Sequence, residues 1–290
     1  CALGARLPAH NPDRTPQRIL SRFDGYPDPT ETKADSEVVC VNPALHHPNV
    51  TLRTRARVLR LETDATGREV TTVVAERDGV EERYRGDIVV LACGAVNSAA
   101  VLLRSASDRH PHGLGNRSGL VGRNYMCHNN GMVISITARD NPSQFQKAFA
   151  IADYYHGAPD SEFPLGLIQL MGKPDPDFLS AVAGPHLPGV AAEDLWRRTV
   201  DFFITAEDLP NPENRVTVDH DGVIRLIYRE NNLEAYARLR AALVGHLDSI
   251  ESSTTGRLPI HVGPKLGVSG VSHQNGTLRF GHDPASSVLD

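Results

Sequence analysis

The stretch Asp87–Ser105, DIVVLACGAVNSAAVLLRS, decides how this chain folds. Its first part, Ile88–Ala92, is continuously apolar, which predicts a strand buried on both faces. The small residues Cys93–Ala95 follow as a tight turn, and the apolar residues after them recur at helical spacing, with Asn97 or Ser98 placed to cap the helix. We therefore expect a strand, a small turn and a helix, where backbone approaches a ligand closely and the helix N-terminus favours an electron-rich group.

Upstream of this stretch, the pattern predicts a β-meander. Thr66-Gly67 and Asp78-Gly79 separate its later strands, and Asp-Gly between alternating apolar residues is a strong hairpin signal. The predicted strands are Val50–Arg53, Arg57–Glu62, Glu69–Arg77 and Glu81–Arg85.

Downstream, short alternating strands are separated by long loops that contain Pro and Gly. A helix is predicted from Leu233 to about Ile250, because its apolar residues form one stripe. Strands in a run followed by a helix predict an antiparallel sheet with a helix on one face. Asp221-Gly222 predicts a hairpin of the last two strands. The expected strands are Met132–Thr137, Leu165–Met171, Asp201–Thr205, Arg215–Val218 and Val223–Tyr228.

Length and charge narrow the class of protein. A chain of 290 residues is long enough for two domains, and we assign residues 1–131 and 262–290 to one and 132–261 to the other. A net charge of −5 argues against nucleic acid as a partner. No window approaches the ~20 apolar residues that span a bilayer. The fold class expected is mixed, α+β and α/β.

The cysteines and the first residue bear on the state of the thiols and on whether the chain is part of a longer protein. The four cysteines are far apart and form no C-x-x-C, so we expect free, mostly buried thiols. The chain begins on Cys1 without a leader, which favours an internal piece of a longer protein over a processed, lipid-modified terminus. The compartment in which the protein works is left open.

The C-terminal stretch Ser272–Asp290, SHQNGTLRFGHDPASSVLD, contains the best candidate for a catalytic base. His273 precedes the pair Gly276-Thr277, and a histidine side chain can be neutral at physiological pH, as a general base must be. Taken by itself, His273 is better explained as a loop histidine bonded to backbone.

Two other patterns are weaker. Gly113, Gly115 and Gly119 are spaced as GxGxxxG without a preceding strand, so they predict a loop and not a dinucleotide site. The histidines His46-His47, His110 and His112 lack carboxylate or cysteine neighbours at metal-ligand spacing, which favours solvated side chains. No GxSxG elbow is present, which argues against a serine hydrolase.

Four blocks together resemble the glucose-methanol-choline (GMC) family of FAD-dependent alcohol oxidoreductases, in the family's order. They cover about a quarter of the chain. GAVNSAAVLLRSA is similar to the family's second signature, and HxxGT followed by DP and a terminal VLD is similar to its catalytic block. The blocks are DIVVLACGAVNSAAVLLRSA, GLGNRSGLVGRNYMCHNNG, AEDLPNPENRVTVDHDGVIRLIY and SHQNGTLRFGHDPASSVLD.

The resemblance implies roles for particular residues. His273 would accept the substrate hydroxyl proton while hydride leaves for flavin N5. Val58 would offer backbone hydrogen bonds to the adenine of FAD, and the turn Cys93, Gly94 and Ala95, with Asn97, would lie against the adenosine. The polar pair His128-Asn129 would lie near the active-site side of the sheet.

The resemblance also implies a partial, Rossmann-like FAD-binding domain beside an antiparallel substrate domain. The substrate would be a sugar, polyol or choline-like alcohol, and the electron acceptor oxygen, a quinone or a cytochrome. The family's N-terminal GxGxxG unit and the segment after the catalytic block, which holds a second His or Asn, are not in this sequence. We therefore expect an internal fragment of such an enzyme, or else a non-catalytic binding or scaffold remnant.

Overall fold

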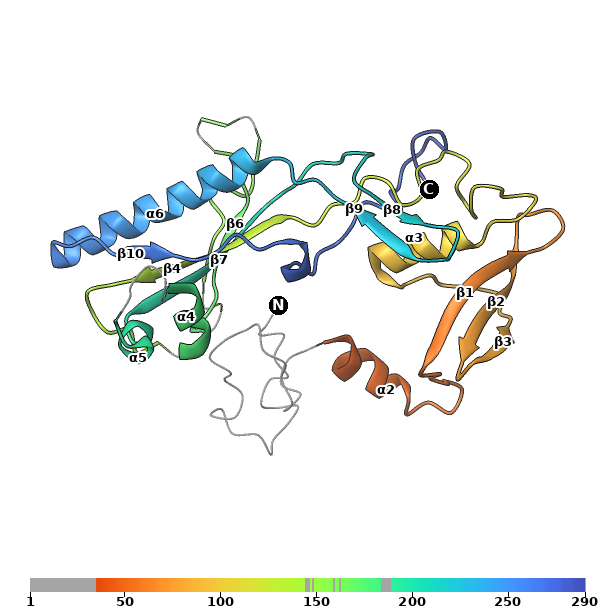
Figure 1. The fold of residues 1–290 in the computed structure, drawn as a ribbon, viewed down its shortest axis with the longest axis horizontal. Helices are drawn as coiled ribbons and strands as arrows, with labels where there is room; N and C mark the ends of the chain where they lie inside the picture. The colour runs from red at the N-terminus through yellow and green to blue at the C-terminus, as the bar shows by residue number, and fades with distance from the viewer. Residues whose placement is uncertain are drawn as a thin grey trace. The chain divides into compact units, whose positions relative to one another are not determined.

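The computed structural model describes residues 35–143, 147, 149–158, 160–161, 163–183 and 189–289 (Figure 1). They divide into two compact units, which are described separately. Unit 1 comprises the described parts of Cys1–Thr51, Asn129–Glu207 and Asn232–Gly270. Unit 2 comprises those of Leu52–His128, Asp208–Asn231 and Val271–Asp290. This division reports compactness alone, and the predicted domain boundaries stay a prediction.

The β-meander of unit 2 is confirmed as a three-stranded antiparallel sheet in the order β1-β2-β3. The turn between β2 and β3 is formed by Asp78 and Gly79, which both have positive φ, as Asp-Gly hairpin turns require. The predicted strand at Val50–Arg53 is wrong: this segment is exposed and belongs to no strand. The strands are β1 (Ala56–Thr63), β2 (Val70–Arg77) and β3 (Val80–Tyr84).

The predicted helix after the small turn is present as α3 (Gly94–Arg104), but it begins earlier than expected. Its N-cap is Cys93, which makes no side-chain cap hydrogen bond, so the prediction of Asn97 or Ser98 as the cap is wrong. Ser98 lies inside the first turns, where its Oγ accepts the Cys93 N–H at 3.1 Å. Gly94, at φ +76°, lets the chain turn into the helix ahead of the predicted caps.

The predicted buried strand Ile88–Ala92 is also wrong. The segment forms no strand, and Ile88 and Val90 are 85% and 79% exposed. A strand buried on both faces needs neighbouring strands that accept its backbone hydrogen bonds. None of the strands in the described part of the chain pairs with this segment. The apolar run therefore predicts a strand for which the described residues provide no pairing partner.

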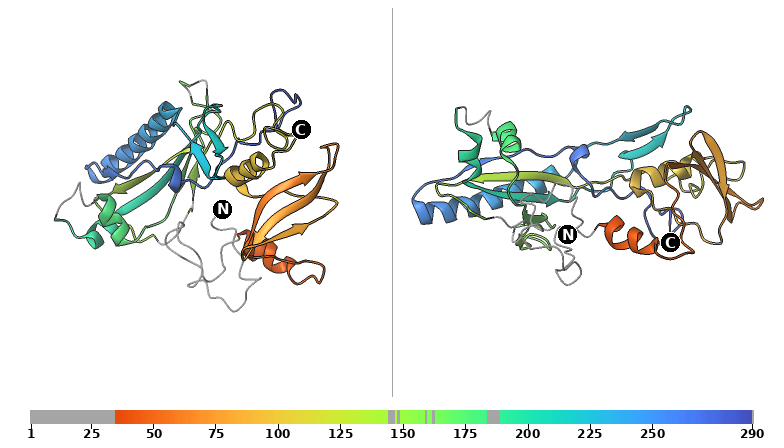
Figure 2. Two further views of the ribbon diagram at one scale, coloured as in Figure 1. Left: turned by 45° about the vertical axis from the view of Figure 1, so that its right-hand side comes forward. Right: turned by 90° about the horizontal axis from the view of Figure 1, so that it is seen from below.

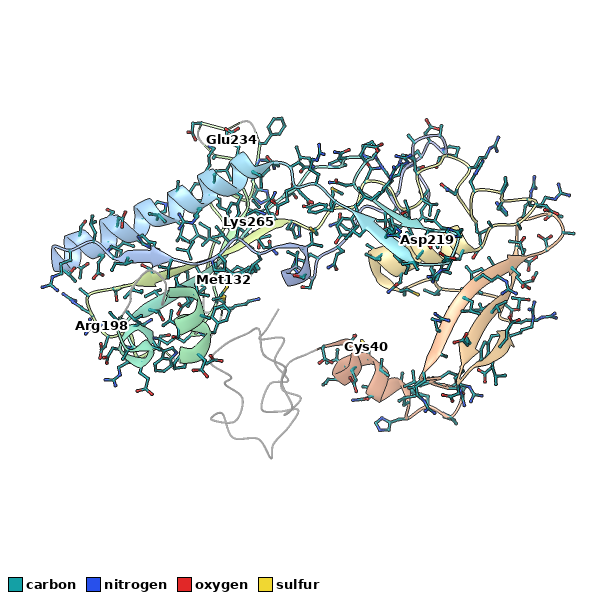
Figure 3. All side chains as sticks on the ribbon, in the orientation of Figure 1. Cys40, Met132, Arg198, Asp219, Glu234 and Lys265 are labelled. Carbon is teal, nitrogen blue, oxygen red and sulfur yellow. The ribbon has the colours of Figure 1, made fainter. Side chains whose placement is uncertain are left out.

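The predicted hairpin of unit 2 is confirmed as β8 (Arg215–Val218) and β9 (Ile224–Ile227). Its turn is organised by Asp219, labelled in Figure 3, whose Oδ1 accepts the N–H groups of Asp221 and Val223. The Val216 N–H in turn donates to the Gly122 carbonyl at 2.8 Å, which ties the hairpin to the loop that follows α3.

Unit 1 is built on a five-stranded antiparallel sheet in the order β10-β4-β7-β6-β5. Short helical segments η2 (Glu37–Val41), α2 (Asn42–Ala44) and η3 (Val268–Gly270) also belong to its sequence. The strands are β4 (Asn129–Ile136), β5 (Ala150–Ile151), β6 (Leu167–Leu170), β7 (Thr199–Ala206) and β10 (Ile260–Val262).

The predicted antiparallel sheet with a helix on one face is confirmed, and helices cover its other face as well. The long α6 (Leu233–Thr255) runs along one face (Figure 2), where Leu239 and Leu243 pack against Val133. On the other face, α4 (Pro176–Ala183) and α5 (Ala192–Trp196) pack against Ile134. Because successive side chains of a strand point to opposite faces, Val133 and Ile134 belong to two separate cores. No helix within the described ranges is both long and apolar enough to cross a bilayer.

Truncation of the α6 stripe tests this packing. Leu239 is fully buried, whereas Leu258 is 68% exposed. We expect Leu239→Ala to lower the free energy of unfolding by about 2–5 kcal/mol, because it removes buried methyl groups and leaves a cavity. Leu258→Ala is the matched control, with a change within about 0.5 kcal/mol. Denaturant unfolding of both variants measures the difference, and equal losses would contradict the assignment of Leu239 to the core.

Candidate active site

The loop that carries His273 is tied to unit 2 by backbone and side-chain hydrogen bonds. Asn275 and Met126 exchange both of their backbone hydrogen bonds, at 2.9 and 3.0 Å. Thr277, only 1% exposed, donates its hydroxyl to the Ala95 carbonyl at 2.7 Å. The Thr277 carbonyl accepts the Gly122 N–H at 2.9 Å. The loop is therefore held both to the first turn of α3 and to the segment around Met126.

Gly276 is required by this arrangement. Its φ is +89°, and a Cβ at this position would lie 2.0 Å from the Asn124 carbonyl oxygen. A side chain is thus excluded both by backbone conformation and by a backbone atom that cannot move aside. The Gly-Thr pair of the sequence pattern consequently has a structural role, which is to bring the loop into close contact with its neighbours.

His273 itself is exposed, and its ring meets that of His128. The ring centroids are 5.3 Å apart and the planes are at 87°, an edge-to-face geometry within the range usual for aromatic pairs. Both residues belong to unit 2. The family resemblance predicts His128 near the active site, and the structure places it against the predicted base.

The carboxylate of Asp208, which the sequence patterns did not single out, binds the backbone of His128 and of the residue before it. Asp208 Oδ2 accepts the Cys127 N–H at 2.9 Å, and Oδ1 accepts the His128 N–H at 3.1 Å. The Tyr228 hydroxyl donates to Oδ2 at 3.1 Å. Asp208 lies within the quoted AEDLPNPENR block, so the block marked the segment without revealing the role of this residue.

An aromatic pair adjoins Asp208, formed by the fully buried Tyr125 and the half-buried Tyr228. The rings of Tyr125 and Tyr228 are 5.6 Å apart and meet edge to face. Burial is the largest cause that raises the pKa of Tyr125 to about 12, and the neighbouring Cys127 and Asp208 add to it. Burial, with contributions from the Cys127 thiol and Asp208, also raises the pKa of Tyr228. Both hydroxyls therefore stay protonated at neutral pH, and Tyr228 is a donor to the carboxylate.

The residues predicted to meet the cofactor lie on two elements of unit 2. Val58 is half-buried in β1 opposite Ala75, at an irregularity in the pairing and on a strand that forms one edge of the meander. Cys93, Gly94 and Asn97 are exposed around the start of α3. The structure joins Ala95 to the His273 loop through Thr277.

A hydrogen bond joins β1 to the α3 region, but it does not bring Val58 close to the start of the helix. That bond lies at the far end of the helix, where the Leu61 N–H donates to Ser105 Oγ at 2.8 Å.

The start of α3 suits the close approach of a ligand. A Cβ added at Gly94 would meet no atom within 4 Å, so the surface there is open. The neighbouring side chains are small, and the first turn of a helix offers backbone N–H groups. These features fit the adenosine part of FAD, while the cofactor roles of the individual residues stay predictions.

The described thiols differ from the expectation of mostly buried cysteines. Cys127 is buried, but Cys40 and Cys93 are exposed, and Cys1 lies outside the described residues. Exposure of Cys93 follows from its position at the open start of α3. Among the residues that the structure describes, no group of three His, Cys, Asp or Glu side chains could hold a metal ion.

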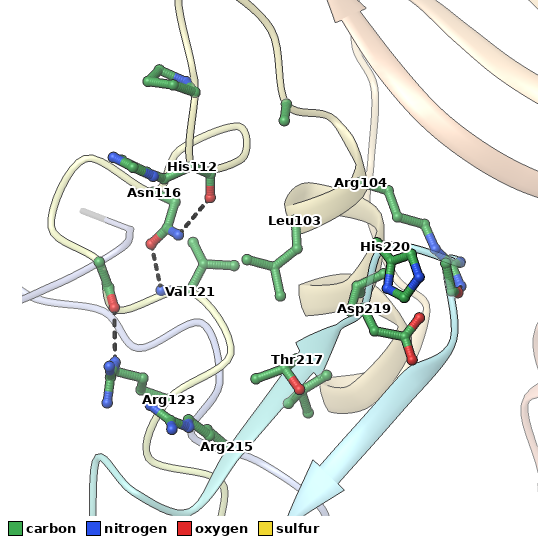
Figure 4. A pocket seen from close by; sticks show the side chains of 16 residues that line it. Leu103, Arg104, His112, Asn116, Val121, Arg123, Arg215, Thr217, Asp219 and His220 are labelled. Carbon is green, nitrogen blue, oxygen red and sulfur yellow. Dashed lines mark hydrogen bonds between the residues drawn. The ribbon is translucent and has the colours of Figure 1, made fainter.

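One cavity of unit 2, about 560 Å³ in volume, lies at the opposite end of α3 (Figure 4). Arg123 and Arg215 lie on one side of it, Arg104 and His220 on the other, with Leu103 between them. None of the predicted site residues lines this cavity. An eleven-residue helix is about 16 Å long, which separates the cavity from the Thr277 anchor at the first turn of α3.

Comparison with known proteins relates this chain to a family. Residues 9–130 match the model of the GMC oxidoreductase family. The chain is 31% identical over 290 residues to 6'''-hydroxyparomomycin C oxidase of Streptomyces lividus, with 90% of this chain and 48% of that protein covered. It is 32% identical over 275 residues to paromamine 6'-oxidase of Streptomyces fradiae, with the same shares covered. The chain thus spans about half the length of these curated relatives.

A solved structure shares the fold. The crystal structure of pyridoxine 4-oxidase from Mesorbium loti superposes with a TM-score of 0.57 at 19% sequence identity, over 90% of this chain and 54% of that one. At this identity the likeness concerns the fold alone, and it agrees with the mixed α/β class predicted from the sequence.

Substitution of Gly276 tests the construction of the loop. We expect Gly276→Ala to destabilise the protein more than Gly115→Ala, a control with positive φ but no atom within 4 Å of the added Cβ. The control should cost only the ~1–2 kcal/mol of a side chain in the left-handed region. Denaturant unfolding gives both values, and equal losses would show that the Asn124 carbonyl does not restrict this position.

Proposed function

Because this chain belongs to the GMC oxidoreductase family, we propose that it is part of an FAD-dependent enzyme that oxidises an alcohol to a carbonyl compound. The observation that carries the proposal is the hydrogen bond from Thr277 to the Ala95 carbonyl. It attaches the loop of the proposed base to the turn proposed to meet the cofactor. A proton acceptor and a cofactor surface are thereby held in one unit.

His273 is the proposed proton acceptor. Its ring is exposed, as a group that meets substrate must be, and a neutral imidazole nitrogen can accept the hydroxyl proton. The Asn275 side-chain amide donates to the His273 carbonyl at 3.0 Å, which restrains the backbone beneath the ring. FAD, when bound, supplies the acceptor for the hydride that leaves the carbinol carbon. The alcohol thus loses one proton to His273 and two electrons with the hydride.

The proposed substrate is a small polar alcohol, either a sugar, a polyol or a choline-like molecule. The relatives support this class, since they are named as oxidases of 6'''-hydroxyparomomycin C and of paromamine. The proposed electron acceptor is oxygen, a quinone or a cytochrome. The antiparallel sheet of unit 1 is the proposed substrate domain.

Replacement of His273 tests the assignment in the whole protein that contains this chain. We expect His273→Ala to slow anaerobic flavin reduction by alcohol about a hundredfold or more, because the hydroxyl proton loses its acceptor. His282→Ala is the matched control, since His282 is another exposed histidine of the same stretch. Stopped-flow absorbance of the flavin measures both rates.

Near-normal reduction in His273→Ala would overturn the assignment. If the protein binds flavin and no alcohol of a panel reduces that flavin, the result would instead support the binding or scaffold alternative.

The Thr277 anchor is tested by a pair of substitutions. Thr277→Val keeps the shape of the side chain but removes the hydroxyl that donates to the half-buried Ala95 carbonyl, a loss of about 0.5–1.5 kcal/mol. We expect a lower melting temperature and slower flavin reduction, both recovered in Thr277→Ser, which keeps the hydroxyl. Equal behaviour of the Val and Ser variants would show that the hydrogen bond does not hold the site together.

A further inference from the structure

We propose that His128 is a positioning residue that orients the ring of His273, and that the Asp208 carboxylate holds His128 in place for this purpose. The inference rests on the proposed role of His273 as the base. It concerns three residues of unit 2, so it does not depend on how the two units are placed.

His273 needs such a partner because its side chain is exposed. A histidine ring in solvent rotates about two side-chain torsions, and fixing them costs conformational entropy. The edge-to-face contact with His128, at 5.3 Å and 87°, favours one orientation of the ring. A base that already points in one direction reaches the substrate proton without this ordering step.

The backbone of His128 is held in an unusual conformation. Its φ is +71°, in the left-handed region that side chains other than glycine rarely adopt. Such a conformation persists where the surroundings impose it, and it is frequent at functional sites. Here the surroundings are the two oxygens of Asp208, which accept the successive N–H groups of Cys127 and His128. Consecutive N–H groups that face one anion form a concave binding site of the kind called a nest.

Asp208 is in turn a rigid support. It is 6% exposed, and its Oδ2 also accepts the Tyr228 hydroxyl. Tyr228 packs edge to face against the fully buried Tyr125. The contacts therefore run from an aromatic pair through a carboxylate to a histidine pair, in which His128 is half-buried and His273 is exposed. A carboxylate needed only to close the loop would not require an aromatic ring at position 128, and this difference makes the proposal testable.

Two substitutions separate the ring from the backbone. His128→Asn removes the ring but keeps a residue that tolerates the left-handed conformation. His128→Phe keeps an aromatic ring without the imidazole nitrogens. In the whole protein, we expect His128→Asn to lower kcat roughly tenfold with little change in KM, because orientation of the base matters in the transition state and not in binding. His128→Phe should recover most of the rate.

A spectroscopic measurement tests the contact without activity. In the full-length resting protein with histidines labelled at Cε1, the His273 ring signal, assigned through His273→Ala, should carry a ring-current shift from His128. We expect this shift to be lost in His128→Asn, retained in His128→Phe and reduced in Asp208→Asn, which replaces one accepting oxygen by an NH₂ group.

Loss of the shift together with the lower kcat in His128→Asn, and recovery of both in His128→Phe, supports the proposal. An unchanged ring-current shift of His273 in His128→Asn overturns the proposal. Loss of the shift with an unchanged kcat also overturns it. If His273→Ala retains normal flavin reduction, the proposed base is wrong, whereas the ring contact is still judged by the spectrum. The two failures are therefore distinguishable.

Discussion

The hydrogen bond from the Thr277 hydroxyl to the Ala95 carbonyl is the constraint on which the candidate site depends. It joins residues 182 positions apart in the sequence, a buried threonine and a half-buried residue in the first turn of α3. Gly276 allows the approach because it has no side chain, and the Gly122 N–H closes the other side of the loop. The position of His273 follows from these contacts and not from the residues next to it.

The two units use different means to obtain a defined structure. Unit 1 buries two apolar cores on opposite faces of one sheet, under α6 and under α4 and α5. The site of unit 2 is built from loops, whose backbone groups are satisfied by Asp208, Thr277 and one another. This agrees with the general tendency of functional side chains to lie on loops that a scaffold positions.

A local pattern is sufficient where its contacts are also local. The turn at Asp78-Gly79 and the hairpin of β8 and β9 each depend on neighbours within a few residues, and both were predicted correctly. The run Ile88–Ala92 has an equally clear pattern, but a buried strand depends on partners elsewhere. Without a pairing strand among the described residues, its side chains stay exposed.

The sequence by itself determined the mixed fold class, the meander, α3, α6 and, through the four family blocks, the choice of His273. Only the tertiary structure decided that His128 faces His273 and that Asp208, eighty residues from His128, holds its backbone. It also decided the early start of α3 at Gly94. The physical reason is that periodicity and turn residues record local backbone preferences, whereas hydrogen bonds between distant segments leave no periodic trace in the sequence.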